Sequence, residues 1–367
     1  MILLLALACT SGKDLDTEDT AAPAVDPLSW DLAVAGPYNV GFRSWPITYT
    51  PAPGMDPRTV LFQIWYPTED TDGDAVFYSA GFPDTGTVAP VAWADATLAP
   101  SPWGGTYPVH AYSHGYQGYG GSSAFLMRHF ASHGWIGVAV DHTNNTLMDH
   151  RDPMPTAVYV ARPRDISAAL DTLEALPDGD PLQGLADTSK VLLSGHSFGN
   201  YTTWAAAGAR YDNAAARCDA GQVATGTCTQ AERDAFAAGS DDPRVVATIP
   251  MAGTVDRGWF GDAGPAQVGV PVLAMSGTND PIGQQEQFDA MQGVDFTWID
   301  LEGGCHQAFA LGACGNLPTD EGFAIIDTYA MAFARLKVLG ADDARARAIL
   351  DGSETVSARV AWAHKDP

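Results

Sequence analysis

Seven short apolar runs, separated by stretches of helical periodicity, constrain the fold of this chain more than any other feature. Each run is almost continuously hydrophobic, as strands are when helices cover both faces of their sheet. The segments between them repeat apolar residues every three to four positions, which predicts helices. This alternation predicts one α/β domain with a mainly parallel central sheet and helices on both faces. The predicted strands are 60–66, 109–113, 136–140, 191–194, 245–251, 270–276 and 296–300, and the predicted helices are 123–133, 164–176, 201–210, 284–291 and 321–339.

One polar stretch interrupts the alternation. Residues 211–243 are rich in alanine and polar side chains, which predicts an excursion from the sheet. Two interpretations stay open, a lid at the rim of a site or a surface insertion without a role. The remainder of 29–355 is predicted to be a single domain, and 356–367 a C-terminal tail without expected order.

The N-terminus predicts export. The first nine residues, MILLLALAC, are too short to span a bilayer and resemble the signal of an exported lipoprotein. In that case Cys9 carries the lipid, and the following residues to position 28 form a disordered acidic linker. Without lipidation the same stretch is a flexible tail. We expect an exported protein, either a cell-envelope lipoprotein or a secreted one.

The charge balance excludes some classes of binding partner. The chain carries 44 acidic and 19 basic side chains, for a formal net charge of -25. Such a surface repels nucleic acid and anionic membranes at long range, so neither is an expected partner. Membrane contact is expected only through the lipid anchor, and a monomer is expected.

Four further cysteines form two local pairs, Cys218 with Cys228 and Cys305 with Cys314. An even number in close pairs, without C-x-x-C spacing, predicts two disulfides and an oxidising compartment. Reduced structural cysteines are the alternative. Export and oxidation support each other.

The segment GHSFG, residues 195–199, joins a predicted strand to a predicted helix. Gly195 and Gly199 allow strand and helix to approach closely around a sharp turn. This G-x-S-x-G pattern is typical of a nucleophile elbow, and it predicts Ser197 as a nucleophile.

A serine nucleophile needs a base and an acid, which in this arrangement follow it in the order acid, then histidine. His306 follows the strand 296–300 and is predicted to act as general base and acid. The other downstream histidine, His364, lies at the C-terminus. Asp280 is predicted to orient the imidazole, with Asp256 as its rival.

The glycine-rich segment SHGYQGYGG, residues 113–121, lies where a second oxyanion donor is needed. The expected donors are the backbone N–H groups of Tyr116 and Phe198. The side chains of Tyr116, Gln117 and His196 are predicted to line the substrate pocket.

No metal or cofactor is expected. His129 and His133 stand four residues apart on one predicted helix, but no third ligand accompanies them, so a polar helix face is the favoured interpretation. Arg162 and Asp165 are predicted to pair or cap where a helix opens. The sequence has no phosphate loop, dinucleotide fingerprint or zincin motif.

Five segments together resemble the dienelactone-hydrolase-like branch of the α/β hydrolases, which includes platelet-activating-factor acetylhydrolases and cutinase-type polyester hydrolases. They are SHGYQG, LMRHFASHGWIGVAVDHTNNT, GHSFG, GTNDPIG and GGCHQAF, within residues 59–339. The resemblance implies the α/β-hydrolase fold. The polyester hydrolases also carry a tyrosine in the oxyanion loop, matched by Tyr116, and a substrate-facing tryptophan for which Trp259 is a candidate here. Asn200 stands where a second glycine is common.

These features predict a serine hydrolase that cleaves short-chain or polyester-like carboxylic esters through an acyl-enzyme. Two alternatives stay open. One is a phospholipase of the platelet-activating-factor acetylhydrolase type, and the other is a surface binding module without catalysis on the same fold.

Overall fold

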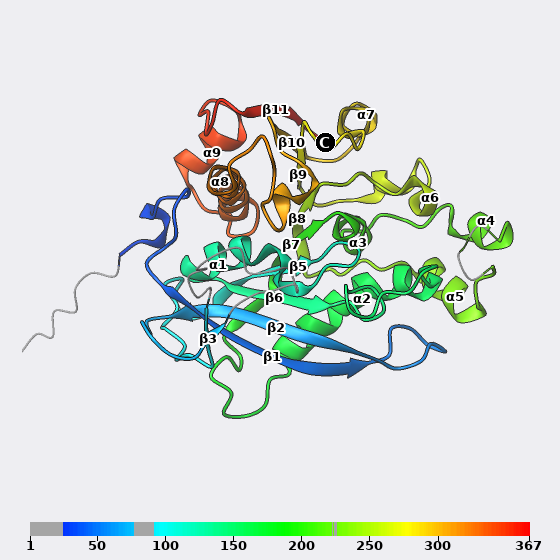
Figure 1. Cartoon of the computed structure of the whole chain (residues 1–367), viewed down its shortest axis with the longest axis horizontal. Helices are drawn as coiled ribbons and strands as arrows, with labels where there is room; N and C mark the ends of the chain where they lie inside the picture. Colours follow the sequence, from blue (N-terminus) through cyan, green and yellow to red (C-terminus); the bar gives the residue numbers. More distant parts are fainter. Residues whose placement is uncertain (1–24, 77–91, 222, 224–225) are drawn as a thin grey trace, which may run out of the picture.

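A mainly parallel sheet forms the centre of the structure, a computed structural model that describes residues 25–76, 92–221, 223 and 226–367. Among these residues eleven strands form one sheet in the order β11-β10-β9-β8-β7-β5-β6-β2-β1-β4-β3 (Figure 1). Strands β5 to β10 run parallel, and β2 and β11 join them antiparallel at either side. The strands are β1 (Asn39–Tyr49), β2 (Arg58–Thr68), β3 (Ala75–Val76), β4 (Ala92–Ala94), β5 (Tyr107–Ser113), β6 (Ile136–Asp141), β7 (Ala186–His196), β8 (Val245–Met251), β9 (Val272–Gly277), β10 (Phe296–Leu301) and β11 (Val360–Lys365).

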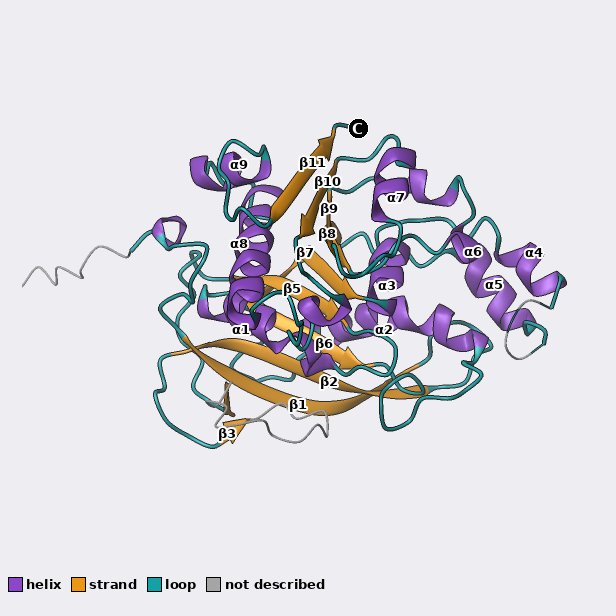
Figure 2. Cartoon of the chain, turned by 45° about the horizontal axis from the view of Figure 1, so that its top comes forward, coloured by secondary structure: helices purple, strands orange, loops and turns teal. Residues whose placement is uncertain are grey.

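Helices cover both faces of this sheet (Figure 2). One face carries α1 (Ala124–Ser132), α8 (Thr319–Lys337) and α9 (Ala344–Leu350), and the other carries α2 (Thr156–Glu174), α3 (Phe198–Ala206) and α7 (Gln284–Ala290). Three further helices lie beside α2 and α3: α4 (Ala214–Asp219), α5 (Gln230–Ala238) and α6 (Arg257–Phe260). No helix in the described ranges has the length and apolar character of a membrane span. The predicted fold class is confirmed.

The strands bury both of their faces, which explains their continuous apolar sequences. In β7, Leu192 packs with α1 and α8, whereas Val191 and Leu193 pack with α2 on the opposite side. All three side chains are fully buried. Full burial of one such side chain contributes about 1.5–3 kcal/mol, so the two-sided core stabilises the central strands most strongly.

Helix α2 begins eight residues before its predicted start at 164. The predicted start directly follows Pro163, but Pro163 lies inside the helix. Proline lacks the N–H that would bond to the carbonyl of Tyr159, and the Tyr201 hydroxyl donates to that carbonyl instead at 3.0 Å. Arg162 and Asp165 are therefore in mid-helix and fully buried, and the prediction that they open the helix is wrong.

The C-terminal residues are ordered, contrary to the predicted tail at 356–367. Val360–Lys365 pair antiparallel with the whole of β10, and the Thr297 hydroxyl and the His364 Nδ1 lie 3.0 Å apart. Lys365 also donates from Nζ to the carbonyls of Phe288 and Asp289 at the end of α7. The residues of β11 are half-buried or exposed. Its sequence is therefore less continuously apolar than the sequences of the buried strands, and this strand was not predicted.

Both predicted cysteine pairs are disulfides in the structure, Cys218–Cys228 and Cys305–Cys314. The first lies in the predicted insertion, which contains helices α4 and α5. Helix α5 packs against α2, and helix α4 packs against α6. The predicted export signal and its lipid-bearing Cys9 lie outside the described residues.

Candidate active site

Ser197 occupies a sharp turn between β7 and α3. Its backbone dihedrals are φ 55° and ψ −113°, a conformation that favours glycine. A Cβ on Gly199 would collide with the carbonyl oxygen of Ser113, and one on Gly195 with the backbone of Gly199. The two glycines therefore let α3 approach β5 and β7, and this approach lifts the Ser197 side chain above the carboxyl end of the sheet.

Three predicted side chains meet at this edge in one chain of hydrogen bonds. Ser197 Oγ lies 2.8 Å from His306 Nε2, and His306 Nδ1 lies 2.8 Å from Asp280 Oδ2. The Asp280 carboxylate accepts the Nδ1 proton, which leaves Nε2 free to accept from the serine hydroxyl. The His306 side chain is 39% exposed, so a substrate or water can reach it.

Asp256, the alternative candidate for the acid, has a different role in the structure. Asp256 precedes α6 and accepts the N–H of Gly258 at 2.9 Å, which makes it the N-cap of that helix. Of the two candidates, the structure brings Asp280 to His306.

A cavity of about 360 Å³ opens above Ser197 and His306. The predicted pocket residues Tyr116, Gln117 and His196 line it. Phe198 is the first residue of α3, so its N–H has no partner within the helix and is available to an anion. Lining residues that were not predicted include Tyr119, Ser122, Leu147, Gln307, Ala310 and Leu311.

His196 is buried directly below the cavity. Its Nε2–H donates to the carbonyl of His306 at 2.8 Å. Burial, and next the electrostatic effect of the neighbouring His306, lower the pKa of His196 to about 4. His196 is therefore neutral at pH 7, and it holds the backbone of His306 without contributing a charge.

Large apolar side chains surround the mouth of this cavity. Tyr116, Leu147 and Leu311 are 40–42% exposed, and the neighbouring Met148 is 90% exposed. Leu147 and Met148 belong to the loop after β6 and Leu311 follows the turn of His306, so the mouth is assembled from distant segments. Nothing in the local sequence marks these residues as neighbours.

The candidate for a substrate-facing tryptophan, Trp259, does not lie at the cavity. Trp259 is 1% exposed and packs between Tyr159 and Phe236, so it does not face a substrate. Of the insertion 211–243, no described residue lines the cavity. Asn200, in place of a second glycine, donates from Nδ2 to the carbonyl of Thr254 at 2.6 Å and so ties α3 to the segment after β8.

Backbone strain is concentrated around this site. Four non-glycine residues with positive φ lie in the segments that follow β5, β6, β7 and β8: Gln117, Asn144, Ser197 and Ala252. In the described residues only Asp95 shares this property elsewhere. Such conformations persist where surrounding contacts enforce them, and they are common in functional sites.

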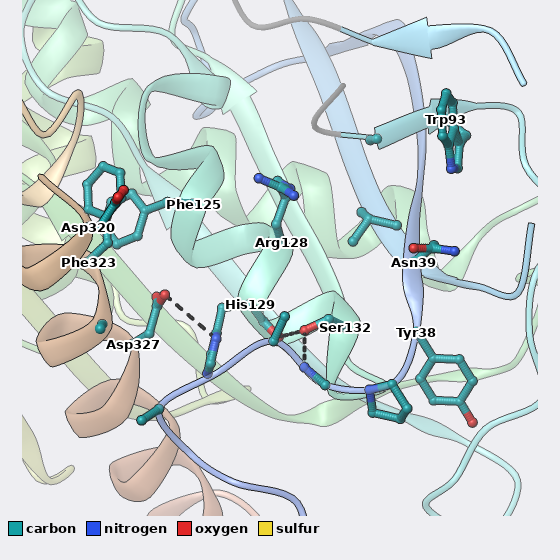
Figure 3. A pocket seen from close by; sticks show the side chains of 17 residues that line it. Tyr38, Asn39, Trp93, Phe125, Arg128, His129, Ser132, Asp320, Phe323 and Asp327 are labelled. Atoms are coloured by element: carbon teal, nitrogen blue, oxygen red, sulfur yellow. Dashed lines mark hydrogen bonds and ion pairs between the residues drawn. The ribbon is translucent and has the colours of Figure 1, made fainter. Parts of the chain in front are cut away.

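His129 of α1 lines a different cavity, of about 480 Å³ (Figure 3), and His133 follows as the C-cap of the same helix. His129 Nδ1 is 3.6 Å from Asp327 Oδ2. Burial lowers the pKa of His129 to about 3 and that of His133 to about 4, so both are neutral. No group of three metal-binding side chains occurs in the described part of the chain.

The sheet order, the turn at Ser197 and the site at the carboxyl ends of the parallel strands define the α/β-hydrolase fold. Among solved structures, a ferulic acid esterase from Streptomyces cinnamoneus has this fold, with a TM-score of 0.61 and 18% sequence identity. That alignment covers 90% of this chain and 98% of the esterase.

More particular similarities each cover about a third of the chain. A family model described as Chlorophyllase matches residues 94–216, which include Tyr116 and Ser197. The cutinases est1 and est2 of Thermobifida alba are each 36% identical to this chain over 112 residues, or 30% of its length. The match spans about a third of either cutinase, 34% and 33%. The resemblance to cutinase-type hydrolases that the motifs predicted is thereby confirmed.

Proposed function

We propose that this protein hydrolyses carboxylic esters through an acyl-enzyme formed on Ser197. The observation that supports this most is the pair of 2.8 Å contacts linking Ser197, His306 and Asp280 at the floor of an open cavity. The cutinase similarity and the esterase fold support the same reaction class.

The first half of the reaction uses His306 as a base. Nε2 takes the Ser197 proton while Oγ attacks the ester carbonyl, and Asp280 stabilises the imidazolium that forms. The amides of Tyr116 and Phe198 bind the resulting oxyanion. His306 then returns the proton to the departing alkoxide, which leaves as an alcohol.

Hydrolysis of the acyl-enzyme repeats these steps with water. His306 takes a proton from the water as it attacks, and Ser197 leaves with that proton. The carboxylic acid departs. The scheme needs no metal or cofactor.

The cavity mouth supports short-chain or polyester-like substrates. An apolar rim of Tyr116, Leu147 and Leu311 can contact an uncharged, poorly soluble ester, whereas the cavity of about 360 Å³ limits the acyl group that enters. The two disulfides support an exported protein, and lipidation of Cys9 remains part of this proposal.

The first test is the initial rate on p-nitrophenyl esters of increasing acyl length, with wild-type protein and Ser197→Ala side by side. We expect activity that falls with chain length, and a loss of at least about 1,000-fold in kcat for the variant with an unchanged Tm. Retained activity in Ser197→Ala would rule out the nucleophile. A wild-type protein without activity on any ester would favour a binding module.

A further inference from the structure

A fully buried arginine lies behind the oxyanion loop. Arg162, in α2, is 0% exposed and contacts three separate segments of the chain. Its Nη2 donates to Ser113 Oγ at 3.1 Å and to the carbonyl of His114, and its Nη1 donates to Asn145 Oδ1 at 2.5 Å. Burying a guanidinium is costly unless its donors are satisfied, so these contacts constrain the neighbours of Arg162 tightly.

The contacts at the end of β5 lead to the Tyr116 amide. Ser113 Oγ, held by Arg162, lies 2.9 Å from His142 Nε2, and the backbone N–H of His142 donates to His114 Nε2 at 2.9 Å. His114 Nε2 is thus an acceptor, so its proton is on Nδ1 and is donated to the carbonyl of Gly115 at 2.6 Å.

This carbonyl determines where the Tyr116 N–H points. The C=O of Gly115 and the N–H of Tyr116 belong to one trans peptide unit, so they point in opposite directions in one plane. The Gly118 N–H also donates to the Gly115 oxygen, at 3.0 Å. With its oxygen held by His114 and Gly118, the peptide directs the Tyr116 N–H away from both of these groups.

The same guanidinium reaches the second amide through α3. Arg162 Nε donates to Thr202 Oγ1 at 3.2 Å, and Cζ lies 4.5 Å from the ring centroid of Phe198. The third segment supports the loop as well, because the carbonyl of Asn145 accepts the N–H of Gln117 at 2.9 Å.

We propose that Arg162 is a positioning residue that fixes the Tyr116 and Phe198 amides relative to each other. It touches neither substrate nor reacting atoms. The inference rests on the proposed ester hydrolysis, because the two amides matter only if an oxyanion forms between them. Arg162 joins their supporting segments, so its loss separates donors that must converge on one oxygen atom.

The test compares Arg162→Met and Arg162→Lys with a matched control, Arg335→Met. Arg335 is also buried in a helix, binds Asp343 at 2.9 Å and the carbonyls of Leu28 and Trp30, and has no partner in the cavity. Assays on a p-nitrophenyl ester are run well below the Tm of each variant. All three variants are expected to lower the Tm.

We expect Arg162→Met to lower kcat about 100-fold with KM changed less than about threefold, since a lost oxyanion donor costs about 100- to 1,000-fold. Arg162→Lys should lose about tenfold, because an ammonium retains only part of the contact set. The inhibition constant of an arylboronic acid, which forms a tetrahedral adduct on serine, should rise in parallel with the loss of kcat/KM. Arg335→Met should keep the wild-type kcat/KM and the wild-type inhibition constant of the boronic acid.

Three outcomes would overturn the inference. The first is that the Arg162 variants lose no more kcat than Arg335→Met does. The second is that the substitutions change KM alone. The third is that kcat falls while the affinity for the boronic acid stays unchanged. If Arg162→Met does not fold, Arg162→Lys supplies the same comparison. An inactive wild-type protein, or an active Ser197→Ala, would instead remove the proposed function and this inference with it.

Discussion

His196 connects the two sides of the site at the scale of a single residue. It directly precedes Ser197, and its Nε2–H donates to the backbone carbonyl of His306. The contact joins the end of β7 to the segment after β10. Burial opposes protonation of the ring, because it lowers the pKa of His196 to about 4.

A stability measurement checks this role. Because the folded pKa of about 4 lies below the unfolded value of 6.5, the unfolded chain binds more protons between these pH values, and stability is lost as the pH falls through this window. His196→Gln keeps an N–H donor and removes the titration. Between pH 7.5 and 4.5, its free energy of unfolding should fall by about 2 kcal/mol less than that of the wild type. Equal losses in urea titrations at the two pH values would contradict the assignment.

The sequence predicted some of the residues that meet at the site and not others, for a physical reason. Ser197 lies in a local pattern, and His306 and Asp280 follow buried strands whose carboxyl ends must share one edge. Arg162 and Leu147 carry no such pattern. Their proximity to the site depends on how α2 and the loop after β6 pack, which local sequence does not encode.

At the scale of elements, the Cys305–Cys314 disulfide closes a short loop that carries His306 and part of the cavity wall. Gln307, Ala310 and Leu311 lie within this loop and line the cavity. The backbone N–H of Cys305 also approaches Cys314 Sγ at 3.1 Å. The loop therefore supports both the base and the pocket.

The second disulfide provides a control for this loop. Its sequence separation is 10 against 9, so the two bridges should stabilise the fold by a similar amount, about 2–3 kcal/mol each. Cys305→Ser with Cys314→Ser should lower kcat/KM at least about tenfold below the Tm, because His306 loses its support. Cys218→Ser with Cys228→Ser should retain activity within about twofold. Equal effects in steady-state assays of the two double variants would show that only global stability matters.

Strands with a continuously apolar sequence were predicted well, and strands with a mixed polar and apolar sequence were not. Each of the seven predicted strands is present because two-sided burial demands continuous apolar sequence. Strand β1 and strand β11 were missed since most of their residues are half-buried or exposed. Helix α3 starts at Phe198 rather than at 201 because the turn at Ser197 leads directly into it.

At the scale of the whole molecule, the net charge of -25 sets the long-range field around the cavity. This field repels anions over about 30 Å at 0.01 M salt and about 10 Å at 0.1 M. The approach of a neutral ester is unaffected.

Two esters of equal length, one neutral and one with a terminal carboxylate, test this effect. We expect kcat/KM for the anionic ester to rise several-fold from about 0.01 to 0.1 M NaCl, because salt screens the repulsion. The value for the neutral ester should stay within about 1.5-fold, which controls for effects of salt on the enzyme. An equal salt response of both esters would show that the field does not act at the cavity.

The positive φ angles around the site lower the stability of the fold, so selection for heat resistance and selection for activity would favour different residues there. Glycine adopts the dihedrals of Ser197 freely, whereas a residue with a Cβ is strained there by about 1–3 kcal/mol. A lineage selected only for resistance to heat would therefore tend to lose the serine. This chain carries a serine at the turn in spite of that strain.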